Sequence, residues 1–178
     1  VLQVLNMINL SSELFKIETG RFVLDAKPVA IGDILRRIIA MARTTFAEKH
    51  LIIAVDVDAA MGKTMPLALG DAMLCYSLFQ NLIKNACEAA PDDSRVSVTL
   101  VDEDPLRIVI ENKGCVPQAI RERFFDKFVT HDKAAGSGLG TYSAKLLTEA
   151  QGGHVEFVVS DPEDTTTITV VLPRALES

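Results

Sequence analysis

Two pairs of β-rich runs, each joined by a short acidic turn, constrain the fold of this chain most strongly. The strand runs are 96–101, 106–111, 155–159 and 166–172, and the amphipathic helical segments are 31–49, 72–89 and 141–151. A short helix is also expected at 120–125. The turns Asp102-Glu-Asp-Pro and Asp161-Pro-Glu-Asp are short enough to join neighbouring antiparallel strands. The pattern therefore predicts an α/β protein, a two-layer sandwich in which helices cover one face of a mixed, mostly antiparallel sheet.

The first part of the chain reads as a separate helix. Apolar residues recur at helical spacing from Val1 to about Lys16, and Gly20 supplies a stop. Residues 22–25 alternate like a short strand before Pro28. Because this helix has an apolar stripe and no obvious partner in the rest of the chain, we expect it to belong to a helical bundle completed by other chain.

Composition bounds the class of protein. With 178 residues and 48% hydrophobic residues, the chain is long enough for one domain with a real core. A net charge of −6 argues against a nucleic-acid partner, and three cysteines without CxxC spacing argue against a disulfide framework or a zinc site. No apolar run approaches the roughly 20 residues of a membrane span. The sequence favours a cytoplasmic location and leaves open whether a parent protein is anchored in a membrane.

One helix presents two asparagines to the same side. Asn81 and Asn85 are four residues apart in the 72–89 segment, with Lys84 beside them. Asparagine is a poor residue for a helix interior, so the pair indicates either a solvated face or a polar site. Two amide oxygens suit Mg²⁺, held directly or through water, and a lysine side chain reaches a phosphate. The functional interpretation makes Asn81, Lys84 and Asn85 catalytic and makes the two asparagines metal ligands.

A glycine-rich segment, Gly136-Ser-Gly-Leu-Gly140, opens the helix that starts near Thr141. Glycines allow close approach of the backbone to a phosphate, and a helix start favours an anion. The spacing fits neither a Walker A loop nor a Rossmann turn. The segment is either a phosphate-binding loop or a flexible connection that caps the helix.

The strand run 106–111 continues into the polar turn Glu111-Asn-Lys-Gly-Cys-Val-Pro117. Glu111 or Asn112 can accept a hydrogen bond from the amino group of a base, and Gly114 lets a ring approach the backbone. The alternative is a strand that simply ends in a turn.

Four segments, in this order, resemble the sequence boxes of the GHKL ATPases, a group that includes DNA gyrase, MutL, the ninety-kilodalton heat-shock chaperones and the sensor histidine kinases. Asn81-Leu-Ile-Lys-Asn-Ala-Cys-Glu88 resembles the N box, and Arg121-Glu-Arg-Phe-Phe-Asp-Lys-Phe128 resembles the F box of histidine kinases. The segment 136–145 with Gly152-Gly153 is similar to their G2 box and the helix after it. The segment 10–20, then Pro28-Val-Ala-Ile, is similar to the end of the second dimerisation helix and its link. The resemblance divides the chain into residues 1–24, the end of a dimerisation helix with its linker, and residues 25–178, a catalytic ATP-binding domain.

The resemblance implies an ATP pocket of the Bergerat type. In such a pocket Asn81 and Asn85 contact Mg²⁺, the turn after the 106–111 strand holds adenine, and the loop from about Thr130 to Gly140 is a lid over the phosphates. Phe124, Phe125 and Phe128 anchor that lid by burial or form a core cluster, and both interpretations can hold. The residues implied to border the cofactor are Glu111, Asn112, Gly114, Lys127, Phe128, Gly136, Ser137, Gly138, Leu139, Gly140 and Thr141.

The turn at 111–115 departs from the family's G1 box, Asp-x-Gly-x-Gly, because it contains no aspartate. Counting back from Pro117 places Glu111 at the aspartate position and Cys115 at the second glycine. A turn shortened by one residue instead places Asn112 there and Gly114 at the first glycine, and we favour Asn112. A neutral acceptor is expected to bind adenine less strongly than a carboxylate does.

The resemblance implies a protein-histidine kinase that transfers the γ-phosphoryl group of Mg-ATP. The family's acceptor histidine lies on a dimerisation helix, and His50, His131 and His154 all lie outside the N-terminal helix, so the acceptor is expected outside this chain. His131 falls in the expected lid, where it can touch a phosphate. The implied partners are ATP, a histidine-bearing helix in cis or in trans, the receiver domain of a response regulator, and a second copy of the chain bound through the N-terminal helix.

Two alternatives remain at this point. The first is a degenerate GHKL binding module with little or no ATP affinity, which serves as a signalling scaffold. The second is an ATPase of the mismatch-repair or chaperone type, although the helix followed by Gly20 and Pro28 favours a histidine kinase.

Overall fold

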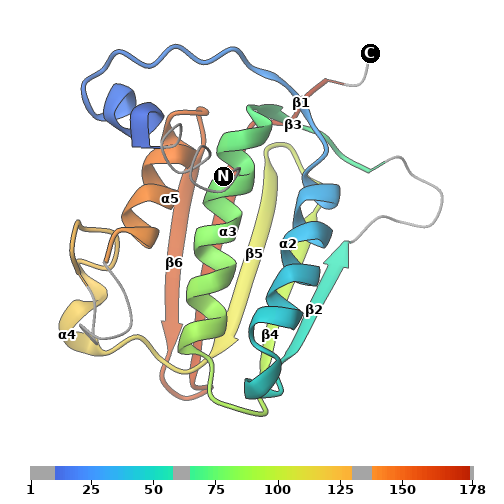
Figure 1. Cartoon of the computed structure of the whole chain (residues 1–178), viewed down its shortest axis with the longest axis vertical. Coiled ribbons are helices and arrows are strands. Elements are labelled where there is room, and N and C mark those ends of the chain that lie inside the picture. Colours follow the sequence, from blue (N-terminus) through green and yellow to red (C-terminus); the bar gives the residue numbers. More distant parts are fainter. Residues whose placement is uncertain (1–10, 58–64, 130–137, 177–178) are drawn as a thin grey trace.

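The computed structural model describes residues 11–57, 65–129 and 138–176, which form two layers (Figure 1). In chain order the elements are β1 (Lys27–Val29), α2 (Ile31–Thr45), β2 (Ile52–Val57), β3 (Ala68–Gly70), α3 (Ala72–Ala89), β4 (Arg95–Val101), β5 (Leu106–Lys113), α4 (Gln118–Arg121), α5 (Gly140–Glu149), β6 (His154–Ser160) and β7 (Thr165–Leu172). A short 3-10 helix, Ala47–Lys49, follows α2. Residues 11–18 are also helical.

The main sheet has five strands in the order β2-β4-β5-β7-β6. The β2–β4 pair is parallel, and the other three pairs are antiparallel. Both acidic turns join antiparallel neighbours, β4 to β5 and β6 to β7, as the sequence predicts. The predicted fold class is therefore confirmed.

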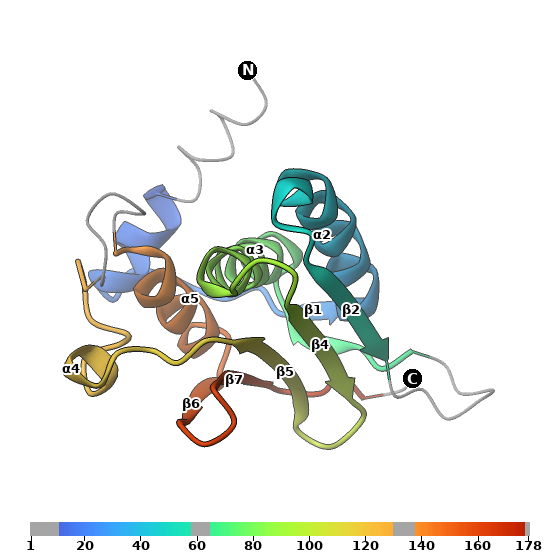
Figure 2. The same ribbon diagram turned by 90° about the horizontal axis from the view of Figure 1, so that it is seen from below.

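Helices α2, α3 and α5 cover one face of this sheet and leave the other face open (Figure 2). The strands alternate accordingly: on β5, Leu106, Ile108 and Ile110 are buried beneath the helices, and the residues between them are half-buried. Helix α3 lies between α2 and α5 and packs on both (Figure 1). Its Leu78, with no exposed surface, lies in the one core cluster of the described residues.

Both ends of α3 have identifiable caps. The Asp71 carboxylate accepts from the backbone N–H groups of Met73 and Leu74 at 2.8 and 2.9 Å, which satisfies two donors at the helix start. At the other end, Lys49 Nζ donates to the carbonyl oxygens of Cys87, Glu88 and Ala90 at 2.9, 3.0 and 2.5 Å. A cation is favourable at a helix C-terminus, so Lys49 stabilises the last turn of α3.

Three predicted boundaries differ from the structure. Residues 22–25 are not a strand; the strand is β1, which contains Pro28 and pairs only with the short strand β3, so the missing N–H of proline costs little. Helix α2 ends at Thr45 instead of continuing to Lys49. The short helix expected at 120–125 is α4, and turns follow it.

The predicted stop at Gly20 is confirmed. Gly20 has φ +69°, and the N–H of Arg21 donates to the carbonyl of Lys16 at 2.8 Å, a closing bond that requires the left-handed conformation glycine adopts readily. Within the described residues, no helix has the length and apolar character needed to cross a bilayer.

Replacing Leu78 with alanine should lower the free energy of unfolding by about 2–5 kcal/mol, because the side chain is fully buried and its removal leaves a cavity. The exposed Gln80 on the same helix provides the control, and Gln80→Ala should change stability by less than about 0.5 kcal/mol. Urea unfolding followed by circular dichroism measures both. Equal losses in the two variants would contradict the packing described for α3.

Candidate functional site

The two asparagines of α3 lie on the flank of the helix away from α2. Asn81 and Asn85 are half-buried and one helical turn apart. Lys84 is exposed, and its ammonium lies 3.5 Å from a carboxylate oxygen of Glu88 one turn later. The structure thus keeps both amide groups on one face and engages the lysine with a neighbouring acid along the outer surface of the helix.

Strand β5 separates the two candidate base acceptors. Glu111 and Asn112 lie on opposite faces, because side chains alternate to the end of the strand at Lys113. Glu111 is exposed on the open face and accepts from Thr167 Oγ1 at 3.3 Å. Asn112 is only 5% exposed, faces the helix layer, and donates from Nδ2 to the carbonyl of Lys113 at 2.7 Å.

The turn after β5 meets the end of α3 closely. Gly114 has φ +97°, and a Cβ atom built there would lie 3.2 Å from the carbonyl oxygen of Ala89. Ala89 is one turn beyond Asn85, so the glycine turn and the asparagine face meet at the same end of the molecule. Any other residue at 114 would have a strained backbone, and its Cβ atom would occupy the space between the turn and the end of α3, which is why glycine suits this position.

Sequence reasoning missed Thr166, which is paired with Asn112 across the β5–β7 ladder. Its side chain is 4% exposed, and its hydroxyl donates to the carbonyl of Gly114 at 2.8 Å and accepts from the N–H of Val116 at 3.2 Å. The run of three threonines at 165–167 was the available signal, because in a strand at least one of three consecutive threonines faces the core, where its hydroxyl needs a hydrogen-bond partner.

The F-box segment is anchored by aromatic packing. The rings of Phe124 and Phe157 stack with centroids 4.3 Å apart, and Phe125 packs edge-on against both. Phe128 differs from the burial expected of an anchor, since it is 71% exposed and has φ +62°. The cluster therefore holds the middle of this segment, and Phe128 lies at its exposed end.

The described part of the glycine-rich segment is joined to the F box. The N–H of Phe128 donates to the carbonyl of Gly138 at 3.0 Å, and the buried hydroxyl of Thr141 donates to the carbonyl of Phe124 at 2.9 Å. Gly138 has φ +66°, and a Cβ atom there would lie 2.7 Å from the Phe128 backbone. Leu139 and Gly140 begin α5, and Gly140 faces open space. Gly136, Ser137 and His131 lie outside the described residues.

Lys127 is engaged by the N-terminal helical segment. Its ammonium lies 2.5 Å from Glu18 Oε1 and 4.9 Å from the centre of the Tyr142 ring, and the Tyr142 hydroxyl donates to the same carboxylate at 2.7 Å. The Lys127 hydrogen bond, followed by that of Tyr142, lowers the pKa of Glu18, and the same pairing raises the pKa of Lys127. This contact joins residues 11–18 to the C-terminal end of the F-box segment 121–128.

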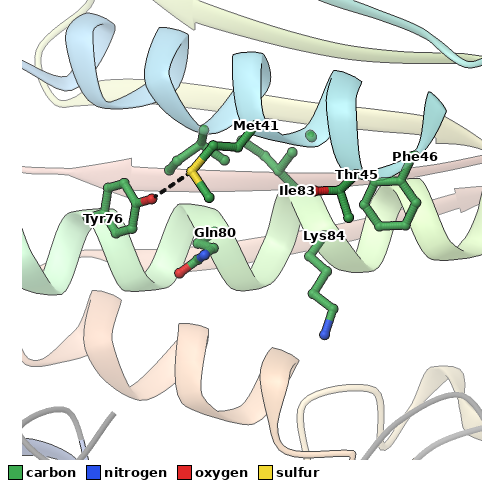
Figure 3. Close-up of a pocket in the computed structure, with 9 residues that line it drawn as sticks. Met41, Thr45, Phe46, Tyr76, Gln80, Ile83 and Lys84 are labelled. Carbon is green, nitrogen blue, oxygen red and sulfur yellow. Dashed lines mark hydrogen bonds between the residues drawn. The ribbon is translucent and has the colours of Figure 1, made fainter. Parts of the chain in front are cut away.

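A cavity of about 130 Å³ lies elsewhere, between α2 and α3 (Figure 3). Tyr76 donates to Met41 Sδ across it at 3.4 Å, and Ile83 and the side chain of Lys84 border it. Asn81, Asn85 and the turn after β5 are not among its lining residues. It is a crevice between two packed helices, and among the candidate residues on α3 only Lys84 borders it.

The amide oxygens of Asn81 and Asn85 suit a cation that is held partly by the protein and partly by the phosphates of a nucleotide. Within 11–57, 65–129 and 138–176, no group of three or more His, Cys, Asp or Glu side chains is placed to hold a metal ion. Mg²⁺ prefers oxygen ligands, keeps several waters, and is commonly bound by one or two protein groups together with phosphates. The half-buried amide oxygens of Asn81 and Asn85 fit that role.

Comparison with known proteins agrees with this geometry. Residues 70–176 match the family described as histidine kinase-, DNA gyrase B- and HSP90-like ATPases. The sensory histidine kinase/phosphatase NtrB of Rhodobacter capsulatus is 30% identical over 144 residues, which cover 72% of this chain and 39% of that protein. The solved structure of the mycobacterial sensor histidine kinase MprB has a TM-score of 0.71 and 25% identity, covering 85% of this chain and 99% of that one.

A third similarity concerns the fold alone. Full-length ShkA, solved in complex with AMPPNP, has a TM-score of 0.79 at 23% identity and covers 99% of this chain and 37% of that one.

The chain therefore belongs to the histidine kinase-, DNA gyrase B- and HSP90-like ATPase family, whose ATPase domain matches residues 70–176. The predicted resemblance to sensor histidine kinases is confirmed at the level of the family. The chain spans 40% or less of the length of the first curated relatives that it matches.

The contact between Glu18 and Lys127 should depend on pH. Because the pKa of Glu18 is lowered in the folded protein, the contact should be complete above the ordinary glutamate pKa of 4.5 and should be lost only as pH falls through the lower, folded-state value. Glu18→Gln should release the segment at neutral pH. Hydrogen exchange of residues 15–22 measures both effects. Glu13→Gln is the control, since Glu13 pairs within its own helix, with Lys16 at 2.7 Å; equal release in that variant would contradict the role of Glu18.

Proposed function

We propose that this chain is the catalytic ATP-binding part of a sensor histidine kinase, which binds Mg-ATP and presents its γ-phosphoryl group to a histidine on a dimerisation helix. The observation that carries the proposal is the meeting of the asparagine face of α3, the inward-facing Asn112 and the Gly114 turn at one end of an ATPase-family domain. Phosphoryl transfer needs mainly positioning and electrostatic stabilisation, which such a rigid set of groups supplies.

At the base end, Asn112 is the residue that we assign to adenine. Its side chain faces the helix layer, and its amide nitrogen is bonded to the Lys113 carbonyl, so the amide oxygen is the group that accepts from the adenine amino group. Glu111 lies on the opposite face of the sheet and is given no role in base binding. Gly114 provides space for the ring beside the backbone.

At the phosphate end, Asn81 and Asn85 are proposed to hold Mg²⁺, which neutralises charge on the phosphates when it is bound. Lys84 and Lys127 supply further positive charge, but both are paired in this structure, with Glu88 and Glu18. Lys127 must therefore leave Glu18 before it can contact a phosphate. Gly136, Ser137, Gly138, Leu139, Gly140 and Thr141 are proposed to line the phosphate side as a lid and helix start.

The proposed partners follow from the same assignment. Residues 1–24 are proposed to be the end of a dimerisation helix and its linker, through which two copies associate, and residues 25–178 the catalytic domain. The acceptor histidine, in cis or in trans, and the receiver domain of a response regulator complete the proposed phosphorelay.

The scaffold alternative predicts little or no ATP affinity. The inward-facing acceptor at Asn112 and the two half-buried asparagines on one face of α3 favour binding, since together they offer a base acceptor and cation ligands at the same end of the domain. A titration with ATP in the presence and absence of Mg²⁺ separates the two functions.

Mg-ATP should bind the parent protein, and Asn85→Ala should weaken that binding at least tenfold while it leaves the melting temperature nearly unchanged. The physical reason is that a half-buried polar group is removed from the cation site and no core contact is lost. Isothermal titration with and without Mg²⁺ measures the effect. Equal affinity in the variant and the parent would remove Asn85 from the site, and no binding to the parent would overturn the function itself.

Asn112→Ala should cost about 1–3 kcal/mol of ATP binding, the range for a buried partner left without its hydrogen bond. Glu111→Ala is the matched control, because the two residues are neighbours on opposite faces of β5, and it should cost much less. Competition between ATP and a fluorescent nucleotide ranks the two variants. The reverse ranking would assign the base to Glu111.

A further inference from the structure

The turn after β5, residues 114–116, is bonded to the hairpin turn between β6 and β7, and we call it the base-binding turn because the proposed function assigns it to adenine. The N–H of Gly114 donates to the backbone carbonyl of Asp164 at 2.9 Å, which extends the β5–β7 ladder by one residue. The N–H of Cys115 donates to Asp164 Oδ1 at 3.0 Å. Two consecutive residues of the base-binding turn are thus bonded to one residue that lies about fifty positions later in the chain.

Arg121 forms the second half of this attachment. Its Nε donates to the carbonyl of Val116 at 2.8 Å, and its two Nη groups donate to the Asp161 carboxylate at 2.9 and 2.5 Å. A guanidinium that binds both oxygens of a carboxylate is fixed in orientation as well as position. The pairing lowers the pKa of Asp161, so the carboxylate stays charged at neutral pH. Arg121 thereby connects Val116 of the turn after β5 to Asp161 of the β6–β7 turn.

We propose that the β6–β7 turn fixes the shape of the base-binding turn for nucleotide, with Asp164 and Arg121 as positioning residues. The inference rests on the proposed function and adds to it a set of groups that act through the backbone of residues 114–116. It accounts for a defined turn conformation without a second glycine, because bonds from the hairpin hold the backbone of Gly114 and Cys115. A turn that is ordered before binding loses less conformational entropy when the base arrives.

The backbone of Asp164 allows a clean test. Asp164 has φ +50°, a conformation that glycine adopts freely and asparagine tolerates. Asp164→Gly therefore removes the side-chain acceptor of Cys115 without backbone strain and retains the bond to Gly114. Asp164→Asn keeps an amide oxygen in the same position. The control is Glu163→Ala in the same turn, since the contact of Glu163 with Lys113 is made by its backbone carbonyl.

Two measurements are made on each variant: the dissociation constant for Mg-ATP and the amide exchange rate of residues 114–116 without nucleotide. Asp164→Gly should raise both, the dissociation constant by about tenfold, the equivalent of one lost hydrogen bond. Asp164→Asn should restore both to within about threefold of the parent, and Glu163→Ala should change neither. If Asp164→Gly does not fold, Arg121→Lys tests the other half of the attachment, since lysine cannot bridge Val116 and Asp161 in the same way.

Faster amide exchange without a loss of ATP affinity in Asp164→Gly would overturn the proposal, because nucleotide binding would then not depend on an ordered turn. The same criterion applies to Arg121→Lys where that variant replaces Asp164→Gly. An equal loss in Glu163→Ala would also overturn it. Failure of the parent protein to bind ATP is a different result, which overturns the proposed function and is seen in the same titration before any variant is compared.

Discussion

The burial of one face of α3 against the sheet is the interaction on which the rest of the structure depends. Leu78 and Leu82 have no exposed surface, and they fix the rotation of the helix about its axis. Because helical geometry fixes the angle between these leucines and the two asparagines, that rotation places Asn81 and Asn85 on the flank away from α2. Lys49 fixes the last turn of the same helix, where the Gly114 turn approaches. The core and the candidate site are therefore two faces of one helix.

The proposed base end of the site depends on a second constraint, the continuity of the β5–β7 ladder. Side-chain alternation carries Asn112 to the helix-covered face, and Thr166 directly opposite it bonds to both sides of the following turn. The hairpin turn continues the ladder to Gly114. The turn after β5 is thus held by several independent bonds, which is a physical reason for it to keep its shape without an aspartate.

The proposed phosphate end is assembled from segments that are far apart in sequence. Phe124 stacks on Phe157 of β6, and its carbonyl accepts from Thr141 at the start of α5. Glu18 approaches from the N-terminal helix and binds both Lys127 and Tyr142, the latter 124 positions away. The position of the N-terminal segment and the availability of Lys127 are therefore linked through one carboxylate.

Sequence alone determined the elements with strong periodicity and the order of the family boxes: α3 occupies the predicted segment 72–89, and both hairpins form at the acidic turns. Weak signals failed, as at residues 22–25, because a three-residue edge strand has too little pattern to be seen. Only the tertiary structure placed Asn112 on the helix-covered face and Glu111 on the open face, since a shift of one residue reverses the face and only pairing with β7 fixes the register. It alone brought Asp164 to Cys115 and Glu18 to Lys127, because such contacts depend on chain packing that no local pattern encodes.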